Sequence, residues 1–209
     1  DWLSTFEAIF QANQREAVAF CNVIATDHDT TAGFVPSYER QDEIIIKNVW
    51  GKCQARGIGA GMAVRRHVAL SIGGFDPLLG PGAEFPACEE GDIAIRALLN
   101  GWFILETNKV AVFHDGFRTW HEGKELNRRN WLGVGAAYSK PIKGRQWQAL
   151  IVVLYEGVIM SLGKPIFQIF RFKKPAGIRG FFYFWKGFFL GLKRPVDGKL
   201  VFFGVFDHR

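Results

Sequence analysis

The stretch Glu89-Glu90-Gly91-Asp92-Ile93-Ala94-Ile95-Arg96 decides the fold, because it places three carboxylates directly at the start of an apolar run. Acidic residues favour the first turn of a helix, and the spacing that follows predicts a helix over 89–100 that ends at Gly101. Short apolar segments at 102–105 and 109–113 come next and are typical of strands. A helix followed by strands predicts an α/β domain.

Segments on the N-terminal side of this helix extend the α/β pattern. Apolar residues at helical spacing predict a helix over 2–19, and the apolar run at 18–25 predicts a strand. A second strand is expected at 43–49. A short helix is expected from Arg66 to the glycine pair Gly73-Gly74, because two glycines end helices readily.

The composition is that of a globular protein with an unusual aromatic content. Of 209 residues, 48% are hydrophobic, 22% are charged and 15% are aromatic, which excludes a disordered or disulfide-scaffold chain. The three cysteines, Cys21, Cys53 and Cys88, form no CxxC spacing. We therefore expect a reducing compartment and no structural zinc site. The length allows one large domain or one domain with an appendage.

Charge divides the chain into two parts. Residues 143–209 carry 12 lysines and arginines against 3 acidic residues, whereas residues 1–142 carry 14 against 17. We therefore predict a mildly acidic body over 1–142 and a basic, aromatic, helical tail over 143–209. The apolar run 149–162 in the tail is shorter than the roughly 20 residues that a transmembrane helix needs. It favours an interfacial helix or an incomplete span.

The tail interleaves basic residues with Phe and Trp, a mixture that suits an anionic membrane surface. We expect the protein to associate with the cytoplasmic face of a membrane. The alternative is a helical subdomain that packs its aromatic side chains against the body. Nucleic-acid binding is a third reading, suggested by a sequence pI of 9.3. No RNA or DNA motif supports it, so we expect no nucleic-acid partner.

The three carboxylates at 89–92 are the first candidate for catalysis. A helix N-terminus stabilises negative charge, so Glu89, Glu90 and Asp92 could serve as a general base or meet a metal. The alternative is that acidic residues merely suit a first helical turn. A glycosidase pair is disfavoured, because neighbouring residues on a helix do not face each other across one bond.

Three further stretches carry candidate ligand-binding residues. His114 lies at the expected end of a strand, where open α/β sheets place ligands, although a lone histidine is more often structural. Asp27-His28-Asp29 follows an apolar strand, and its carboxylates either hold a divalent cation or form a polar turn. Arg128 and Arg129 could clamp a diphosphate while Trp131 stacks on a sugar or base. The alternative for these three is a solvated basic helix face.

Taken together, these motifs resemble those of the family 2 glycosyltransferases, which transfer sugars from nucleotide donors with inversion. The resemblance covers about half of the chain tightly, and the order and spacing of its blocks match the family. The blocks are Gly59-Ala60-Gly61-Met62-Ala63-Val64-Arg65-Arg66, Gly73-Gly74-Phe75-Asp76 with Leu79-Gly80, Glu89-Glu90-Gly91-Asp92-Ile93-Ala94-Ile95-Arg96, Gly101-Trp102 and Val112-Phe113-His114.

The resemblance implies a nucleotide-diphospho-sugar transferase fold, Rossmann-like with a mixed sheet. It implies transfer from a nucleotide-sugar donor to a glycan or lipid-linked acceptor. Glu90 matches the position of the family's base, which is usually an aspartate and therefore one methylene shorter. By the same resemblance, Glu89 would orient the acceptor and Asp92 would support the start of the helix.

The resemblance also implies a divalent cation, Mn²⁺ or Mg²⁺. His114 matches a histidine that in many members approaches the metal and the diphosphate, and Arg129 and Trp131 resemble a motif that contacts the diphosphate in processive members. Family members begin with a nucleotide-binding half that ends in a metal-binding Asp-x-Asp. Asp27-His28-Asp29 lies too close to Gly59 to be that motif. We therefore interpret the chain as the C-terminal portion of a larger polysaccharide-synthesising enzyme.

A second reading belongs to another functional class. Glutamate in place of aspartate at position 90, together with the expected lack of a nucleotide-binding half, favours a non-catalytic module derived from the same fold. Such a module would bind a membrane or a glycan without turnover. Hydrolysis of a nucleotide-sugar donor separates the two readings.

Overall fold

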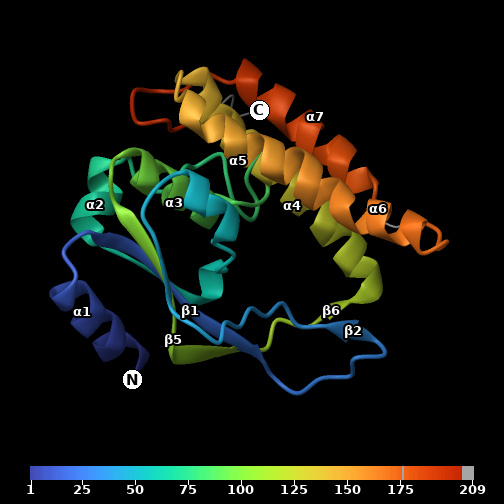
Figure 1. Ribbon diagram of the computed structural model, residues 1–209, viewed down its shortest axis with the longest axis horizontal. Coiled ribbons are helices and arrows are strands. Elements are labelled where there is room, and N and C mark those ends of the chain that lie inside the picture. The colour runs from blue at the N-terminus through green and yellow to red at the C-terminus, as the bar shows by residue number, and fades with distance from the viewer. Residues whose placement is uncertain (176, 204–209) are drawn as a thin grey trace. The chain divides into compact units, whose positions relative to one another are not determined.

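The computed structural model describes residues 1–175 and 177–203, and the chain divides into two compact units (Figure 1). The first unit consists of Asp1–Gly74 and Ile93–Glu125, and the second of Phe75–Asp92 and Leu126–Arg209. The units are therefore interleaved along the chain. The predicted division into 1–142 and 143–209, which rests on charge, stays a prediction.

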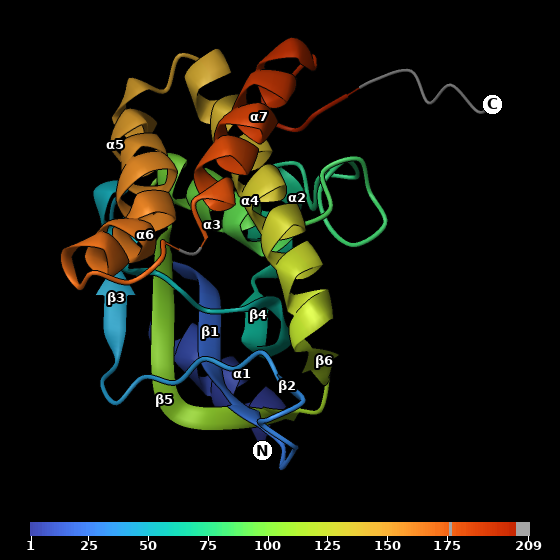
Figure 2. The same cartoon turned by 90° about the vertical axis from the view of Figure 1, so that its right-hand side faces the viewer.

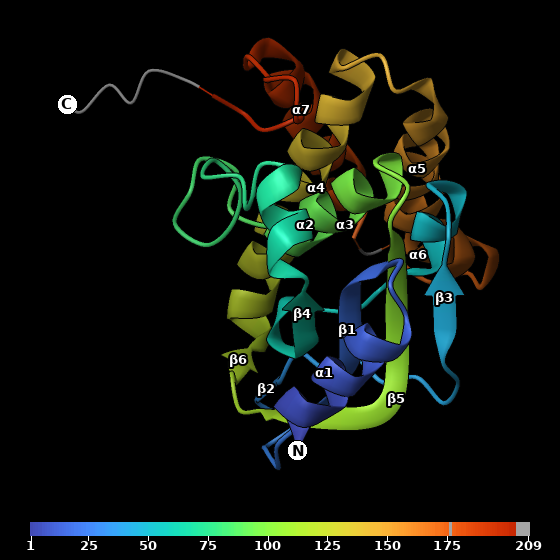
Figure 3. The same cartoon turned by 90° about the vertical axis from the view of Figure 1, so that its left-hand side faces the viewer.

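A mixed four-stranded sheet forms the centre of the first unit. Its strands are β1 (Glu16–Ala25), β3 (Ile44–Ile46), β4 (Met62–Val64) and β5 (Phe103–His114), in the order β3-β5-β1-β4. The pair β1 and β5 is parallel, and the outer strands β3 and β4 are antiparallel to their neighbours. Figure 3 shows β3 and β4 at opposite edges. The predicted α/β class is confirmed at this level.

Helix α1 (Trp2–Ala12) packs on one face of this sheet, as Figure 3 shows. The core there is formed by Phe6 and Ile9 of the helix with Ala19, Cys21 and Leu105 of the strands. The predicted helix over 2–19 is too long, because the chain leaves the helix after Ala12. Residues 16–19 are almost fully buried and pair with β5, so tertiary pairing overrides the helical spacing that precedes them.

Strand β5 is continuous where the sequence predicts two strands. Its pairing with β1 shifts between Cys21 opposite Thr107 and Asn22 opposite Ala111, which leaves an irregularity at 108–110. The polar pair Asn108-Lys109 therefore interrupts the apolar pattern without ending the strand. A β-bulge of this kind accommodates extra residues while pairing resumes on either side.

The remaining described elements of the first unit are short. They are β2 (Gly33–Phe34), which pairs with β6 (Arg118–Thr119), the 3₁₀ segments Trp50–Gln54 and Gly59–Gly61, and helix α2 (Arg66–Ser71). The predicted stop of the Arg66 helix at two glycines is confirmed. Gly73 and Gly74 have φ angles of 97° and 72°, a backbone region that favours glycine.

A buried carboxylate anchors the loop that leads to β4. Glu106 on β5 is 1% exposed, and its Oε1 accepts backbone N–H groups from Arg56 at 2.5 Å and Gly57 at 2.6 Å. Its Oε2 accepts the Tyr38 hydroxyl at 2.8 Å. Burial raises the pKa of Tyr38, so the phenol remains a neutral donor. These bonds satisfy a carboxylate that burial would otherwise penalise.

Helix α3 (Glu89–Leu99) begins in the second unit and continues in the first. Its Arg96 is fully buried and donates to the carbonyl oxygens of Ile72 at 2.5 Å and Gly74 at 2.7 Å. These carbonyls lie at the end of α2 and in the glycine turn. Arg96 thus satisfies backbone acceptors that a helix end leaves open. Arg96 belongs to the motif block 89–96, and Gly74 belongs to the block that begins at Gly73. The hydrogen bond between them connects two blocks of the motif series.

Helices form the second unit. They are most of α4 (Trp120–Lys143), α5 (Leu150–Leu154), a π-helical segment (Tyr155–Met160), α6 (Ser161–Phe170) and α7 (Arg179–Lys193). One continuous helical segment, Trp147–Phe170, has a mean hydropathy of 1.7 and the length that a membrane crossing needs. About a third of it is buried within the protein, so length and composition alone do not assign it to a membrane.

Glycines bring α4 and α7 into close contact. A Cβ added at Gly135 would overlap the carbonyl oxygen of Phe184, and one added at Gly187 would overlap that of Leu132. Gly191 lies against Ala136 and Ser139 in the same way. Figure 2 shows the two helices side by side. Backbones can approach this closely only where a side chain is absent.

Removing the charge of Glu16 is expected to stabilise the protein at neutral pH. Glu16 is 3% exposed, and its pKa is raised first by burial and then by the nearby charge of Glu43. A carboxyl with a raised pKa favours folding below its unfolded pKa and loses that contribution as the pH rises through its folded pKa. Glu16→Gln should therefore raise the Tm at pH 7 and change it little at pH 4.

Thermal unfolding of the Glu16→Gln variant at the two pH values measures this effect. The matched control is Glu7→Gln, which neutralises an exposed carboxylate on α1. We expect the control to show no comparable pH-dependent gain. A Tm of Glu16→Gln below that of the wild type at pH 7 would contradict the account of Glu16 as a desolvated charge.

Candidate functional site

The three predicted acidic residues occupy the first turn of α3. Glu89 and Glu90 are half-buried, and Asp92 is fully buried. The loop before the helix folds closely around Glu89, because a Cβ added at Gly80 would lie 3.3 Å from the Glu89 carboxyl group. Gly80 has a φ of 108°, so this loop conformation requires glycine.

Asp92 belongs to a buried charge cluster in the second unit. Lys140 of α4 places its Nζ 2.6 Å from Oδ1 of Asp92 and 2.5 Å from Oδ2 of Asp76, and all three side chains are 0% exposed. The backbone N–H of Phe202 also donates to Asp76 at 2.7 Å. We call Asp76, Lys140 and Asp92 the buried triad. One cation between two carboxylates compensates charges that would be costly to bury alone.

The three acidic residues of this helical turn lie in different environments, because only Asp92 belongs to the buried triad. Asp92 holds the start of α3 against α4 through its ion pair with Lys140. The role that the resemblance implies for Asp92 stays a prediction. Glu89 and Glu90 are half-buried, and of the Glu90 carboxylate the oxygen Oε2 is buried. A carboxylate at a helix N-terminus is stabilised in its ionised form, which is the form that accepts a proton. Glu89 and Glu90 are thus the acids of this turn that are not fully buried, and their predicted contacts with a substrate stay predictions.

Sequence reasoning missed Lys140, which the buried triad requires. The available signal was a single lysine within the stretch Gly133–Pro141, whose other residues are small, apolar or weakly polar. That pattern does not identify a partner, because Asp76 and Asp92 lie more than forty residues earlier in the sequence. A lysine on an apolar helix face nevertheless indicates a buried ion pair, since lysine is rarely buried without one.

His114 ends β5 in the first unit, as predicted. Its Nδ1 lies 3.0 Å from the carbonyl oxygen of Pro36. A carbonyl can only accept, so Nδ1 carries the proton of this hydrogen bond and Nε2 of the neutral ring has a free lone pair. This is the tautomer that a metal-binding histidine needs. The imidazole also lies against the backbone of Gly116.

The stretch Asp27-His28-Asp29 forms a hydrogen-bonded turn. Asp29 Oδ1 accepts the backbone N–H of Thr31 at 2.8 Å and its hydroxyl at 2.6 Å, and these bonds hold the pKa of Asp29 below its usual range. Both aspartates are exposed. Among the residues that the structure describes, no group of three His, Cys, Asp or Glu side chains is arranged to hold a metal. The geometry of Asp29 agrees with the polar-turn alternative.

Arg129 and Trp131 lie on α4, and both are half-buried. The indole of Trp131 packs edge-on to Phe184 of α7, with ring centroids 6.3 Å apart, and lies against Gly180. The guanidinium of the neighbouring Arg128 stacks over Tyr183 at 5.6 Å. Trp131 and Arg128 thus contribute to the packing of α4 on α7. The predicted diphosphate contacts of Arg129 and Trp131 stay predictions.

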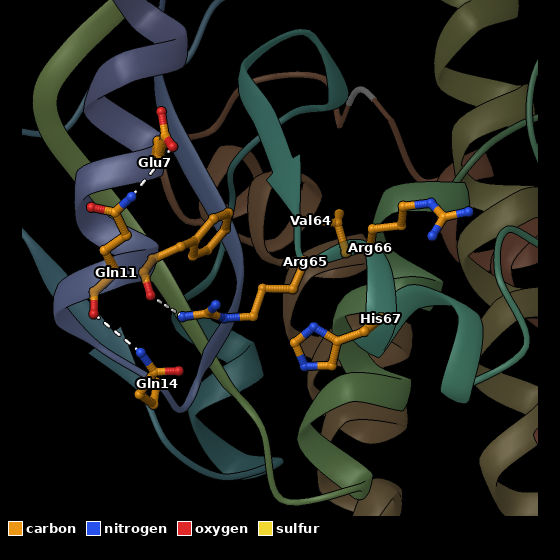
Figure 4. Close-up of a pocket in the computed structure, with 8 residues that line it drawn as sticks. Glu7, Gln11, Gln14, Val64, Arg65, Arg66 and His67 are labelled. Atoms are coloured by element: carbon orange, nitrogen blue, oxygen red, sulfur yellow. Dashed lines mark hydrogen bonds between the residues drawn. The ribbon is translucent and has the colours of Figure 1, made fainter.

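The first unit has a pocket of about 560 Å³ that involves none of the predicted site residues. Its lining residues, drawn in Figure 4, are Glu7, Phe10, Gln11, Gln14, Val64, Arg65, Arg66 and His67. Arg65 donates to the carbonyl oxygens of Glu16, Phe10 and Asn13 and stacks over the Phe10 ring. Its guanidinium is therefore used to tie the end of α1 to the sheet.

Comparison with known proteins yields no significant match: no protein-family model, curated protein or solved structure matches this chain. A functional proposal therefore depends on the motif series and on the geometry of its residues. The best supported element of that geometry is the first turn of α3, with two half-buried glutamates and a third acid, Asp92, bound in the buried triad.

Proposed function

We propose that the chain forms the acceptor-side part of an inverting, nucleotide-sugar-dependent glycosyltransferase of family 2, with the corresponding nucleotide-diphospho-sugar transferase fold. The observation that carries this proposal is the half-buried Glu90 on the first turn of α3, next to an Asp92 that fixes the helix start from inside the core. The mixed sheet and the ordered motif blocks support it.

Inverting transfer is a single displacement that needs one base. The Glu90 carboxylate takes the proton of an acceptor hydroxyl as its oxygen attacks the anomeric carbon of the donor. The bond from that carbon to the diphosphate oxygen breaks, and the nucleoside diphosphate leaves with the electron pair. In this proposal Glu89, one residue away, accepts a hydrogen bond from the acceptor and orients it.

The proposed reaction uses Mn²⁺ or Mg²⁺, which when bound stabilises the negative charge of the departing diphosphate. The hydrogen bond of His114 fits such a role, because Nδ1 is bonded to the Pro36 carbonyl oxygen and Nε2 is therefore the ring nitrogen left for a ligand. Mg²⁺ and similar cations are commonly bound by few protein groups together with substrate phosphates. By the resemblance, His114 would bind the cation, and Arg129 and Trp131 would contact the diphosphate.

A non-catalytic module is the second candidate function. Glutamate at position 90 is one methylene longer than the family's aspartate, and the buried triad would hold α3 in place whether or not turnover occurs. Such a module would bind a glycan or a membrane through the same fold and release no nucleotide.

Release of nucleoside diphosphate from a panel of nucleotide sugars tests the proposal. The assay uses the protein that contains residues 1–209, with Mn²⁺ or Mg²⁺ and with glycan or lipid-linked acceptors. We expect release from at least one donor, and we expect EDTA to abolish it. Folded protein that binds acceptor but releases no diphosphate from any donor would reject transfer and favour the non-catalytic module.

A further inference from the structure

The connection between α6 and α7 and the helix ends beside it carry several large exposed apolar side chains. We call the described residues of 166–182, without Ala176, the hairpin tip. Phe170 is 79% exposed and Phe172 is fully exposed. The other exposed apolar side chains of the hairpin tip are Ile166, Phe167, Ile169, Ile178 and Phe182. A concentration of exposed apolar side chains in one stretch of chain is typical of an interaction site.

This surface is not the packing face of either helix. Helix α7 buries Gly180, Phe184, Gly187, Phe188 and Gly191, the stripe of small and aromatic residues along which it packs on α4. Helix α6 buries Ser161 and Pro165. The apolar residues of the hairpin tip therefore remain exposed after the internal packing of the second unit is complete. Among the described residues of the second unit, nothing covers them, so these side chains can meet a partner.

Charge indicates which partner fits. Residues 157–196 contain eight lysines and arginines and no aspartate or glutamate. Arg171, Lys173, Lys174 and Arg179 belong to the hairpin tip itself and are exposed. An anionic surface would pair with these cations, and only a partner with an apolar interior would bury the phenylalanines. A bilayer that contains anionic lipids satisfies both requirements.

Helix lengths indicate how the hairpin tip meets the bilayer. Helix α7 has 15 residues, which at about 1.5 Å per residue gives roughly 22 Å, short of the ~30 Å hydrocarbon core. It also carries the exposed Lys186 near its middle. The helical segment 147–170 is long enough for a crossing, but it contains the buried Glu156 and the exposed Lys164. These features suit helices that lie at the interface and do not cross the membrane.

We propose that the hairpin tip inserts into one leaflet of an anionic membrane, with Phe170 and Phe172 at the acyl boundary and Lys173 and Lys174 among the lipid phosphates. Insertion is in the plane of the interface, so both ends of the hairpin stay on the same side. The inference is independent of the proposed glycosyl transfer, because it uses only the exposed surface and charge of the second unit.

Binding of the whole chain to vesicles tests the apolar part of this proposal. The vesicles are phosphatidylcholine alone or with about one third phosphatidylglycerol. The double variant Phe170→Ser with Phe172→Ser should lose tenfold or more in partitioning, including the part that survives 0.5 M NaCl. The matched control replaces Phe75 and Phe113, two exposed phenylalanines outside the hairpin tip, with serine. We expect it to bind like the wild type.

The same assay tests the charged part. Lys173→Gln with Lys174→Gln should bind anionic vesicles about 30-fold more weakly, because each basic residue near the surface contributes about 1 kcal/mol. Lys47→Gln with Lys124→Gln removes the same charge from exposed positions elsewhere and should change binding little. Unchanged binding of both hairpin-tip variants, or equal losses in the controls, would overturn the proposal.

Protease added outside sealed vesicles separates insertion in one leaflet from a membrane crossing. In-plane insertion leaves both flanks of the hairpin tip on the outer side, so added trypsin should cleave the bound chain on both sides of 166–182. Protection of one flank that is lost when detergent opens the vesicles would show that the 147–170 helix crosses the bilayer and would overturn in-plane insertion. Complete loss of wild-type binding at 0.5 M NaCl would show that charge alone holds the chain and would equally reject it.

Discussion

Replacing Lys140 with methionine is expected to destabilise the protein by about 3–5 kcal/mol, the loss typical when one partner of a buried ion pair is removed. Methionine fills a similar volume and leaves Asp76 and Asp92, both fully buried, without their shared cation. The substitution also removes the contact of the Lys140 ammonium with the Phe202 ring at 4.9 Å. The cost arises from desolvated negative charge and not from a cavity.

Urea unfolding at pH 7 measures this loss, with Lys124→Met as the control. Lys124 is exposed, so its substitution should change the free energy of unfolding by less than about 0.5 kcal/mol. Adding Asp76→Asn and Asp92→Asn to Lys140→Met should recover part of the loss, because no charge of the triad then remains buried. A Lys140→Met variant as stable as the control would show that the triad is not buried as described.

Replacing Gly187 with alanine is the second change with a large expected effect. The new methyl group would overlap the carbonyl oxygen of Leu132, a backbone atom that cannot rotate away. Helices α4 and α7 must then separate, and the contacts of Phe184 and Phe188 on the same face of α7 are weakened. We expect a loss of about 2–4 kcal/mol, at the upper end of what overpacking costs.

Gly163→Ala provides a matched control for this prediction. Gly163 lies in α6, is exposed and has no atom within 4 Å of the added Cβ position. Alanine there should be neutral or stabilising by up to about 1 kcal/mol, because alanine is the better helix former. Thermal and urea unfolding compare the stability change caused by the same substitution, glycine to alanine, at a tightly packed position and at an open one. Similar effects for both would contradict the close packing of α4 on α7.

Elements that depend on neighbouring residues could be predicted from the sequence. The acidic residues at 89–92 predict the start of α3, and the glycines Gly73 and Gly74 predict that α2 ends before them. Long-range pairing made the rest unpredictable. The helical spacing after Trp2 continues beyond Ala12, and only pairing with β5 converts residues 16–19 into a buried strand.

The candidate site, like the fold, could be predicted only where it depends on residues that are neighbours in the sequence. The sequence places Glu89, Glu90 and Asp92 on one helical turn, but it does not show that Asp92 faces inward. That orientation depends on Lys140, which lies 48 positions further along the chain. Trp131, predicted to contact a diphosphate, packs on Phe184, and this contact depends on how α7 folds back along α4.

The turnover of Glu90→Gln tests the central claim most directly. Glutamine keeps the shape of the side chain and removes the proton acceptor, so the kcat for nucleoside diphosphate release should fall by about 100-fold or more, with little change in donor KM. Glu39→Gln, at an exposed loop position, serves as the control and should retain full activity. The account predicts that only Glu90→Gln loses turnover while its thermal stability stays close to that of the wild type. Near-normal turnover of a folded Glu90→Gln variant would contradict the assignment of Glu90 as the base.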